Sequence, residues 1–183
     1  MIDIMSELIE ALAPHLTREI RAEAGTVLFR QGDPVRHYYV VRSGCVHLVR
    51  WGVDGTNAVM QRATEGSVLA ESSVFADAYH CDGICVSDSV LGRADLSNVR
   101  GALDAQPDLL RRLAQHLGRE VHRLRSRVEL LSRRTVAERL DGWLALNGAQ
   151  LPPRGQWRAV AEDIGISPEA FYRELQRRRR SLG

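Results

Sequence analysis

Three cysteines and the histidines beside them are the side chains of this 183-residue chain best suited to holding a metal ion. In an extended strand Cys81 and Cys85 would share one face, and Cys45 would share a face with His47. Soft thiolates with an imidazole suit copper(I) or zinc, and a Cys or His can also ligate haem iron. The candidate metal ligands are therefore Cys45, His80, Cys81 and Cys85.

The same thiols admit two other roles. A disulfide between Cys81 and Cys85 is disfavoured, because same-face residues four positions apart in a strand stand about 13 Å apart. Cys45 with either partner fits a redox switch better. Buried cysteines also act simply as small apolar core residues, and an odd number of them argues against a disulfide framework. The sequence is therefore compatible with cysteines that sense a signal and with cysteines that only pack in the core.

The segment 161–173 has the pattern of two short helices joined by a tight turn. Gly165 can take the positive φ that such a turn needs, Ser167 can cap the next helix, and Pro168 suits its first position. Apolar residues can pack the two helices together, which leaves polar ones free to enter a DNA groove. A plain surface helical hairpin is the alternative. The candidate DNA-contacting residues are Ser167, Glu169, Tyr172, Arg173 and Arg177.

Charge is distributed unevenly along the chain. Residues 1–105 hold 9 arginines and 14 acidic residues, a net charge of −5, whereas residues 106–183 hold 16 arginines and 9 acidic residues, a net charge of +7. There is no lysine, so every basic group is a guanidinium, which binds phosphate in a bidentate fork. The basic second half favours a DNA-facing end, although the run 177–180 could also be a solvated tail.

The rest of the chain supplies the elements that must position these groups. Residues 4–14 are amphipathic and predict a helix that ends before Pro14. Residues 20–96 contain short β-rich runs separated by glycine-containing turns, which predicts an all-β barrel or sandwich of the jelly-roll type. A helix follows at 135–147. The fold class is α+β, with a sensor roll at 1–106, a dimerisation helix at 107–134 and a DNA-binding domain at 135–183.

Residues 107–134 repeat leucine every seven residues, with β-branched or small residues three positions before most of them. Such heptads favour a parallel two-stranded coiled coil and hence a homodimer. A single long helix packed on its own barrel is the alternative. His116 and His122 are expected to be solvent-exposed. The residues expected in the dimer interface are Leu110, Leu117, Val121, Leu124, Val128 and Leu131.

This order of elements resembles the Crp/Fnr family of bacterial transcription regulators. The matching segments are 28–33, 39–46, 65–75 and the helix-turn-helix pattern at 161–173. The resemblance implies that an effector bound in the roll reorients the DNA-binding domains through the dimer helix. It also places Glu169 and Arg173 at base-reading positions, with Pro168 at a third that is often arginine. The implied partners are double-stranded DNA, a second copy and, for an activator, RNA polymerase.

The resemblance also locates an effector pocket at Glu71, Ser72, Cys81 and Asp82. Cyclic-nucleotide-binding relatives have a Gly-Glu pair and, about ten residues later, an Arg-Ser or Arg-Thr pair; this chain has Ala70-Glu71 and Cys81-Asp82. Because the guanidinium partner of the phosphate is missing, cyclic AMP and cyclic GMP are disfavoured unless another arginine, such as Arg93, replaces it. By the same alignment Cys45 and Cys81 line the pocket, so the thiols could converge there.

Several functions are excluded or left open. The chain lacks a P-loop, a Gly-x-Ser-x-Gly elbow and a His-Glu-x-x-His signature, so an enzyme is not expected. No run of about 20 apolar residues and no signal-peptide pattern is present, which predicts a cytoplasmic protein without a membrane partner. Relatives usually continue into a β-hairpin wing after the segment that ends here in arginines. Either these arginines replace the wing's phosphate contacts, or the domain binds DNA weakly as part of a ligand sensor, or the chain is a truncation.

Overall fold

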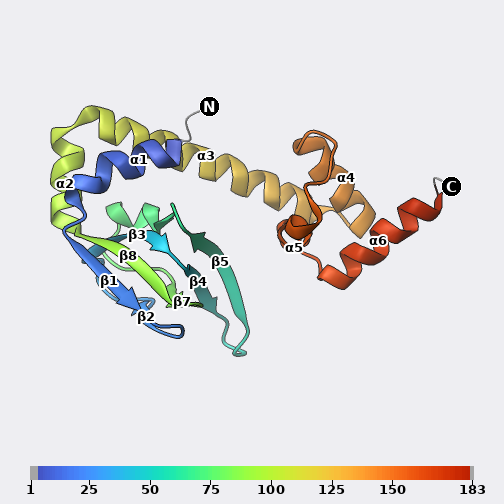
Figure 1. Cartoon of the computed structure of the whole chain (residues 1–183), viewed down its shortest axis with the longest axis horizontal. Helices are drawn as coiled ribbons and strands as arrows, with labels where there is room; N and C mark the ends of the chain where they lie inside the picture. Colours follow the sequence, from blue (N-terminus) through green and yellow to red (C-terminus); the bar gives the residue numbers. More distant parts are fainter. Residues whose placement is uncertain (1–3, 182–183) are drawn as a thin grey trace. The chain divides into compact units, whose positions relative to one another are not determined.

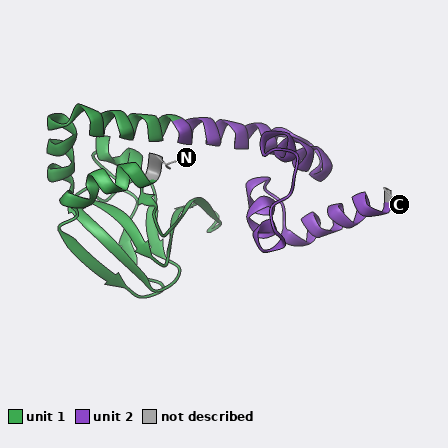
Figure 2. Cartoon of the chain, turned by 45° about the horizontal axis from the view of Figure 1, so that its top comes forward, with its two compact units in different colours: residues 1–118 green, residues 119–183 purple. Residues whose placement is uncertain are grey.

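The computed structural model describes residues 4–181 of the chain. They form two compact units, the first ending at Gly118 and the second beginning at Arg119 (Figure 2). The boundary lies within a 26-residue helix, α3 (Pro107–Ser132), so this helix contributes residues to both units. No described helix is long and apolar enough to cross a membrane.

The first unit is built on two four-stranded sheets whose paired strands all run antiparallel. Their strand orders are β1-β8-β3-β6 and β2-β7-β4-β5, the arrangement of an eight-stranded jelly roll (Figure 1), and this confirms the predicted architecture. The strands are β1 (Arg18–Ala22), β2 (Val27–Phe29), β3 (His37–Ser43), β4 (Cys45–Trp51), β5 (Asn57–Thr64), β6 (Val68–Leu69), β7 (Asp82–Cys85) and β8 (Ser89–Asp95).

Aromatic rings fill part of the space between the two sheets. Phe29 stacks on Tyr79 with ring centroids 3.8 Å apart and reaches Tyr39 of the other sheet at 6.0 Å. Gly83 lies beneath the Phe29 ring, because a Cβ atom at Gly83 would stand only 2.6 Å from the ring. A larger residue at position 83 would therefore force the ring out of the core.

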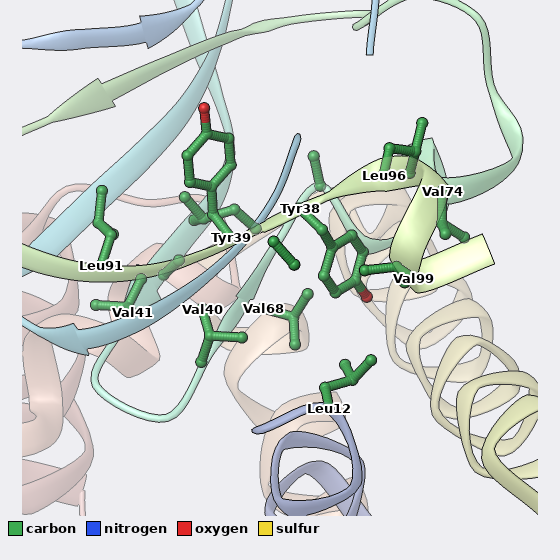
Figure 3. Packing of buried hydrophobic residues seen from close by; sticks show 14 of the residues in the cluster. Leu12, Tyr38, Tyr39, Val40, Val41, Val68, Val74, Leu91, Leu96 and Val99 are labelled. Atoms are coloured by element: carbon green, nitrogen blue, oxygen red, sulfur yellow. The ribbon is translucent and has the colours of Figure 1, made fainter. Parts of the chain in front are cut away.

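Helices cover the outer face of the β1-β8-β3-β6 sheet. They are α1 (Ile4–Leu12), α2 (Leu96–Ala105) and the first part of α3, with short 3-10 turns at Ala13–His15 and Glu71–Phe75. Figure 3 shows Tyr38 of β3 reaching toward Leu12, Val74 and Val99, and all four are buried. Arg112 of α3 pairs with Glu7 of α1, so a charge contact supplements the apolar packing.

The second unit is helical and has its own core. After the end of α3 come α4 (Val136–Leu146), a 3-10 turn (Arg154–Gln156), α5 (Trp157–Asp163) and α6 (Pro168–Ser181). Thr135 begins α4 with a capping box, in which its hydroxyl accepts a hydrogen bond from the Glu138 backbone and the Glu138 carboxylate accepts one from the Thr135 backbone. The buried core residues are Leu130, Leu140, Trp143, Val160, Ala161, Ile164 and Phe171.

Candidate nucleic-acid interface and sensor site

The turn between α5 and α6 has the predicted helix-turn-helix chemistry. Gly165 adopts φ +66°, and the Ser167 hydroxyl accepts a hydrogen bond from the Ala170 backbone at 3.2 Å. Pro168 is the first residue of α6, where its missing N–H costs nothing. Phe171, which the sequence analysis did not single out, is fully buried between the helices. These contacts confirm the local structure expected of the segment 161–173.

Arg139 of α4 holds this turn in place. Its guanidinium donates hydrogen bonds to the carbonyl oxygens of Ile164 and Gly165, both at 3.3 Å. It also donates to the carbonyls of Leu131 and Arg133, at 3.1 and 3.0 Å. One side chain thus joins the end of α3 to the helix-turn-helix. The sequence carried no signal for this role, because each partner is a backbone carbonyl.

The predicted DNA-contacting residues fall into two groups. Ser167, Glu169 and Arg173 are exposed, on the turn and along the first part of α6. Tyr172 is 41% exposed, and its ring lies 5.6 Å from that of Trp157, so its orientation is restrained by a neighbour. Arg177 is exposed but engaged, since it donates two hydrogen bonds of 2.8 Å to Glu174.

Glu174 is a buried carboxylate that organises the arginine run. Arg177 and Arg178 both bond to it, and Arg178 also pairs with Asp141 of α4 at 2.6 Å. The Arg177 hydrogen bonds, followed by those of Arg178, lower the pKa of Glu174 to about 2 despite its burial. Part of the basic run is therefore used to attach α6 to α4, which the sequence analysis did not anticipate.

Helix α3 carries an exposed apolar stripe at the predicted heptad positions. Leu110, Val121, Leu124, Val128 and Leu131 are between 38% and 67% exposed. Leu117 is the exception, because it packs partly against the core of the first unit. Leu109 and Leu113 belong to the core of the first unit, and Leu130 belongs to the core of the second. The helix therefore buries some of its apolar side chains in each unit and leaves the side chains of the stripe largely uncovered.

At the predicted effector pocket, Glu71 contacts α3. His116 Nε2 lies 3.7 Å from Glu71 Oε1, and the His116 side chain is only 6% exposed. The expectation that His116 is solvent-exposed was therefore wrong, because the side chain is buried against the roll. His122 is exposed as predicted. Burial raises the pKa of Glu71. The contact with His116 and the hydrogen bonds to the carboxylate lower it by more, so the pKa of Glu71 lies below its usual value.

The other pocket residues have different surroundings. Asp82 is buried and accepts hydrogen bonds from the Gln31 backbone at 2.7 Å and from Trp51 Nε1 at 3.1 Å. Ser72 is exposed, whereas the neighbouring Ser73 is buried. The carboxylate of Asp82 is thus satisfied by the chain itself.

A guanidinium lies beside the predicted pocket, but it is not Arg93. Arg50 of β4 donates two hydrogen bonds to the His80 carbonyl, at 3.0 and 3.2 Å, and its charge acts on the neighbouring Cys81. Arg93 stands opposite Tyr39 on the other sheet and acts on His37. Sequence reasoning missed Arg50 because the pairing register that brings β4 beside β7 is not visible in the sequence.

The chain is similar to known proteins along most of its length. The family model of the cyclic nucleotide-binding domain matches residues 19–106. The structure of FixK2 from Bradyrhizobium japonicum matches with a TM-score of 0.65 at 18% identity, covering 87% of this chain and 83% of that one. The c-di-GMP responsive global regulator CLP from Xanthomonas campestris matches with a TM-score of 0.64 at 20% identity, covering 96% and 92%. At these identities the two structures show a common fold.

Sequence similarity extends beyond the sensor roll. The nitrogen fixation regulation protein FixK of Bradyrhizobium diazoefficiens is 26% identical over 170 residues, which cover 87% of this chain and 70% of FixK. The match thus runs through the roll, the long helix and the helical unit. The chain therefore contains a cyclic nucleotide-binding domain and is similar in sequence and fold to transcription regulators of the Crp/Fnr type.

Ala70 and Glu71 stand where the resemblance places the Gly-Glu pair of the cyclic-nucleotide cassette. Ala70, at the position of the glycine in the Gly-Glu pair, adopts φ +48°, a left-handed conformation that favours glycine. Glu71 retains its place at the start of the 3-10 turn. The second pair of the cassette differs, because Cys81 is fully buried and Asp82 is bonded internally.

The cysteines of the chain do not assemble the predicted metal site. Cys85 pairs with Val46 across the β4-β7 ladder, so it shares a face with Val46, opposite to that of Cys45 and His47. His80 is exposed, whereas Cys81 is buried. Among the described residues there is no group of three or more His, Cys, Asp or Glu side chains that could hold a metal ion. The expected convergence of these ligands was therefore wrong, because the pairing register separates the faces.

Burial also changes the chemistry of the thiols. It raises the pKa of Cys45, Cys81 and Cys85 above the ordinary value, which the charge of Arg50 only partly opposes at Cys81. Thiols that stay protonated at neutral pH are poor nucleophiles. The three cysteines are free in the structure, and these environments favour core packing.

Proposed function

We propose that this chain is a dimeric DNA-binding transcription regulator of the Crp/Fnr type whose sensor roll responds to an effector other than cyclic AMP. The observation that carries the proposal is the exposed first part of α6, placed on a turn held by Gly165, Ser167 and Arg139. Glu169 would accept a hydrogen bond from a cytosine amino group, and Arg173 would donate a fork to guanine. The proposed location is the cytoplasm, and an activator would also contact RNA polymerase.

Dimerisation through α3 is part of this proposal. The exposed stripe would pair with the same stripe of a second copy. Pairing would bury the leucine and valine side chains that recur along the helix, and removing this apolar area from water would stabilise the dimer. Two copies would then present two copies of α6 to half-sites about 34 Å apart along a duplex.

The proposed effector is not a cyclic nucleotide, because of the surroundings of Asp82. This buried carboxylate is held by the Gln31 backbone N–H and the Trp51 indole. A bound nucleotide would place its phosphate near the Asp82 carboxylate, which is unfavourable without a paired cation. The guanidinium of Arg50 is already bonded to a carbonyl.

A gel-shift assay with DNA from upstream of the protein's own gene tests the proposal. We expect salt-sensitive, sequence-dependent binding. The R173A substitution should weaken this binding by about 1 to 3 kcal/mol and should remove the sequence preference at one base position. R111A is the matched control, because Arg111 is an equally charged, 72% exposed residue of α3 outside the helix-turn-helix. Equal losses in R173A and R111A would assign the effect to net charge alone and contradict base reading by α6.

A second candidate is a ligand sensor with a weak DNA-binding end. It is favoured by one observation: Arg177 and Arg178 are committed to Glu174 and Asp141, which reduces the number of guanidiniums available for phosphate. In that case the gel-shift would show no sequence-dependent binding at any salt concentration. Binding of a small molecule to the roll would then be the remaining activity.

A further inference from the structure

The contact between His116 and Glu71 joins α3 to the sensor cassette. Both side chains are largely buried, at 6% and 13% exposure, and the two atoms stand 3.7 Å apart, which is longer than a hydrogen bond. His116 is the last fully buried residue of α3 before Gly118, where the first unit ends. The contact therefore lies at the end of the segment of α3 that packs on the roll.

Gln61 of β5 fixes the Glu71 carboxylate from the other side. Its side-chain amide donates to the Val68 carbonyl at 3.0 Å and to Glu71 Oε2 at 3.3 Å, and its oxygen accepts from the Ala70 backbone at 3.4 Å. Glu71 thus has one oxygen toward β5 and the other toward α3. A ligand that takes the second oxygen displaces His116 and leaves the Gln61 contacts intact.

Three buried polar side chains of this unit have no hydrogen-bond partner in the part of the chain that the structure describes, and two of them, His116 and Tyr38, interact electrostatically with or lie close to Glu71. Tyr38 Oη, Ser73 Oγ and His116 Nε2 are buried, and none has a hydrogen-bond partner among the described residues. Tyr38 and Ser73 are each only 2% exposed. Burial, followed by the Glu71 charge, raises the pKa of Tyr38, so its hydroxyl stays protonated and can donate. Buried polar atoms of this kind normally have a partner, so their concentration here marks a place where a polar ligand would gain hydrogen bonds.

We propose that His116 is an internal competitor for the effector at Glu71, and that the effector is a small molecule bearing amine, amide or hydroxyl donors. A carboxylate can only accept hydrogen bonds, so a donor group is what could replace His116 there. Displacement of His116 frees the end of the packed segment of α3, the helix that carries the exposed apolar stripe. The role of this release in regulation rests on the proposed function, whereas the contact itself does not.

Hydrogen exchange of the full-length protein tests the coupling. The variants are E71Q, which keeps the shape of the side chain, H116Q, and the double substitution. H122Q is the control, because His122 is exposed on the same helix. We expect E71Q and H116Q each to speed exchange of residues 109–118 about tenfold, and the double variant to add little to either. H122Q should leave this segment unchanged.

Additive effects of the two single substitutions, or an H116Q profile equal to that of H122Q, would overturn the proposal. E71D keeps the charge but shortens its reach, so it should also loosen 109–118 and provides a test if H116Q fails to fold. A gel-shift on the same samples separates the two claims. Coupled exchange without DNA binding in any sample would refute the proposed function alone, and DNA binding with additive exchange would refute the competition alone.

Discussion

Gly165 is the residue at which backbone conformation and packing both restrict substitution. Its φ is +66°, and a Cβ atom there would stand 2.4 Å from Leu131 Cδ2. G165A should therefore destabilise the second unit by about 1 to 3 kcal/mol. Urea unfolding followed by tryptophan fluorescence measures the change. G155A is the control, because Gly155 has neither a positive φ nor an atom within 4 Å of its Cβ position; similar losses in both variants would refute the account of the turn.

Glu174 makes the attachment of α6 sensitive to acid. Its pKa is lowered to about 2 by Arg177 and then Arg178, so its stabilising contribution is present above its ordinary pKa of 4.5 and is lost as the pH falls toward 2. Because Arg177 is well exposed, we expect a contribution of only roughly 1 to 2 kcal/mol. Urea unfolding of the wild type and of E174Q, compared at several pH values between 4.5 and about 2, measures this contribution. The difference between the two proteins should shrink as the pH falls; a constant difference would contradict this role.

At the scale of elements, a substitution in the exposed stripe of α3 should affect the association of two protomers without affecting the fold of one. Val128 is 67% exposed, so V128E should leave the fold of one protomer intact. In a dimer the same carboxylate would be buried without a cation, which we expect to weaken association by about 3 kcal/mol, or more than a hundredfold. Light scattering across a dilution series measures the shift. Q115E, an exposed position of α3 outside the stripe, should behave as the wild type; equal association of V128E and Q115E would exclude this face.

The elements were predictable from the sequence wherever their signals are local. The glycine turn, the serine cap and the proline start of α6 are encoded within four residues, and the structure has all three. Short β-rich runs and the glycine-containing turns between them likewise predicted the jelly roll. The leucine repeat predicted a stripe on α3, and the structure leaves most of it exposed.

The parts that could not be predicted depend on pairing between distant segments. His116 meets Glu71 across 45 positions, and Arg178 meets Asp141 across 37. Neither periodicity nor residue type specifies such pairs. The expected metal site failed for the same reason, since the β4-β7 register decides which face each cysteine occupies.

At the scale of the whole molecule, the account depends on two copies acting together on DNA. The acidic first part and the arginine-rich second part of the chain give each copy a basic end, and phosphate contacts made by such an end weaken steeply with salt. All of these charges are guanidiniums, so binding should combine salt sensitivity with bidentate recognition.

The stoichiometry of the complex with DNA tests this claim most directly. Light scattering after size-exclusion chromatography would give the mass of the protein bound to a duplex from upstream of its own gene. We predict two chains of 20.5 kDa per duplex, with binding lost as the salt concentration rises. One chain per duplex, or no complex at low salt, would contradict the account.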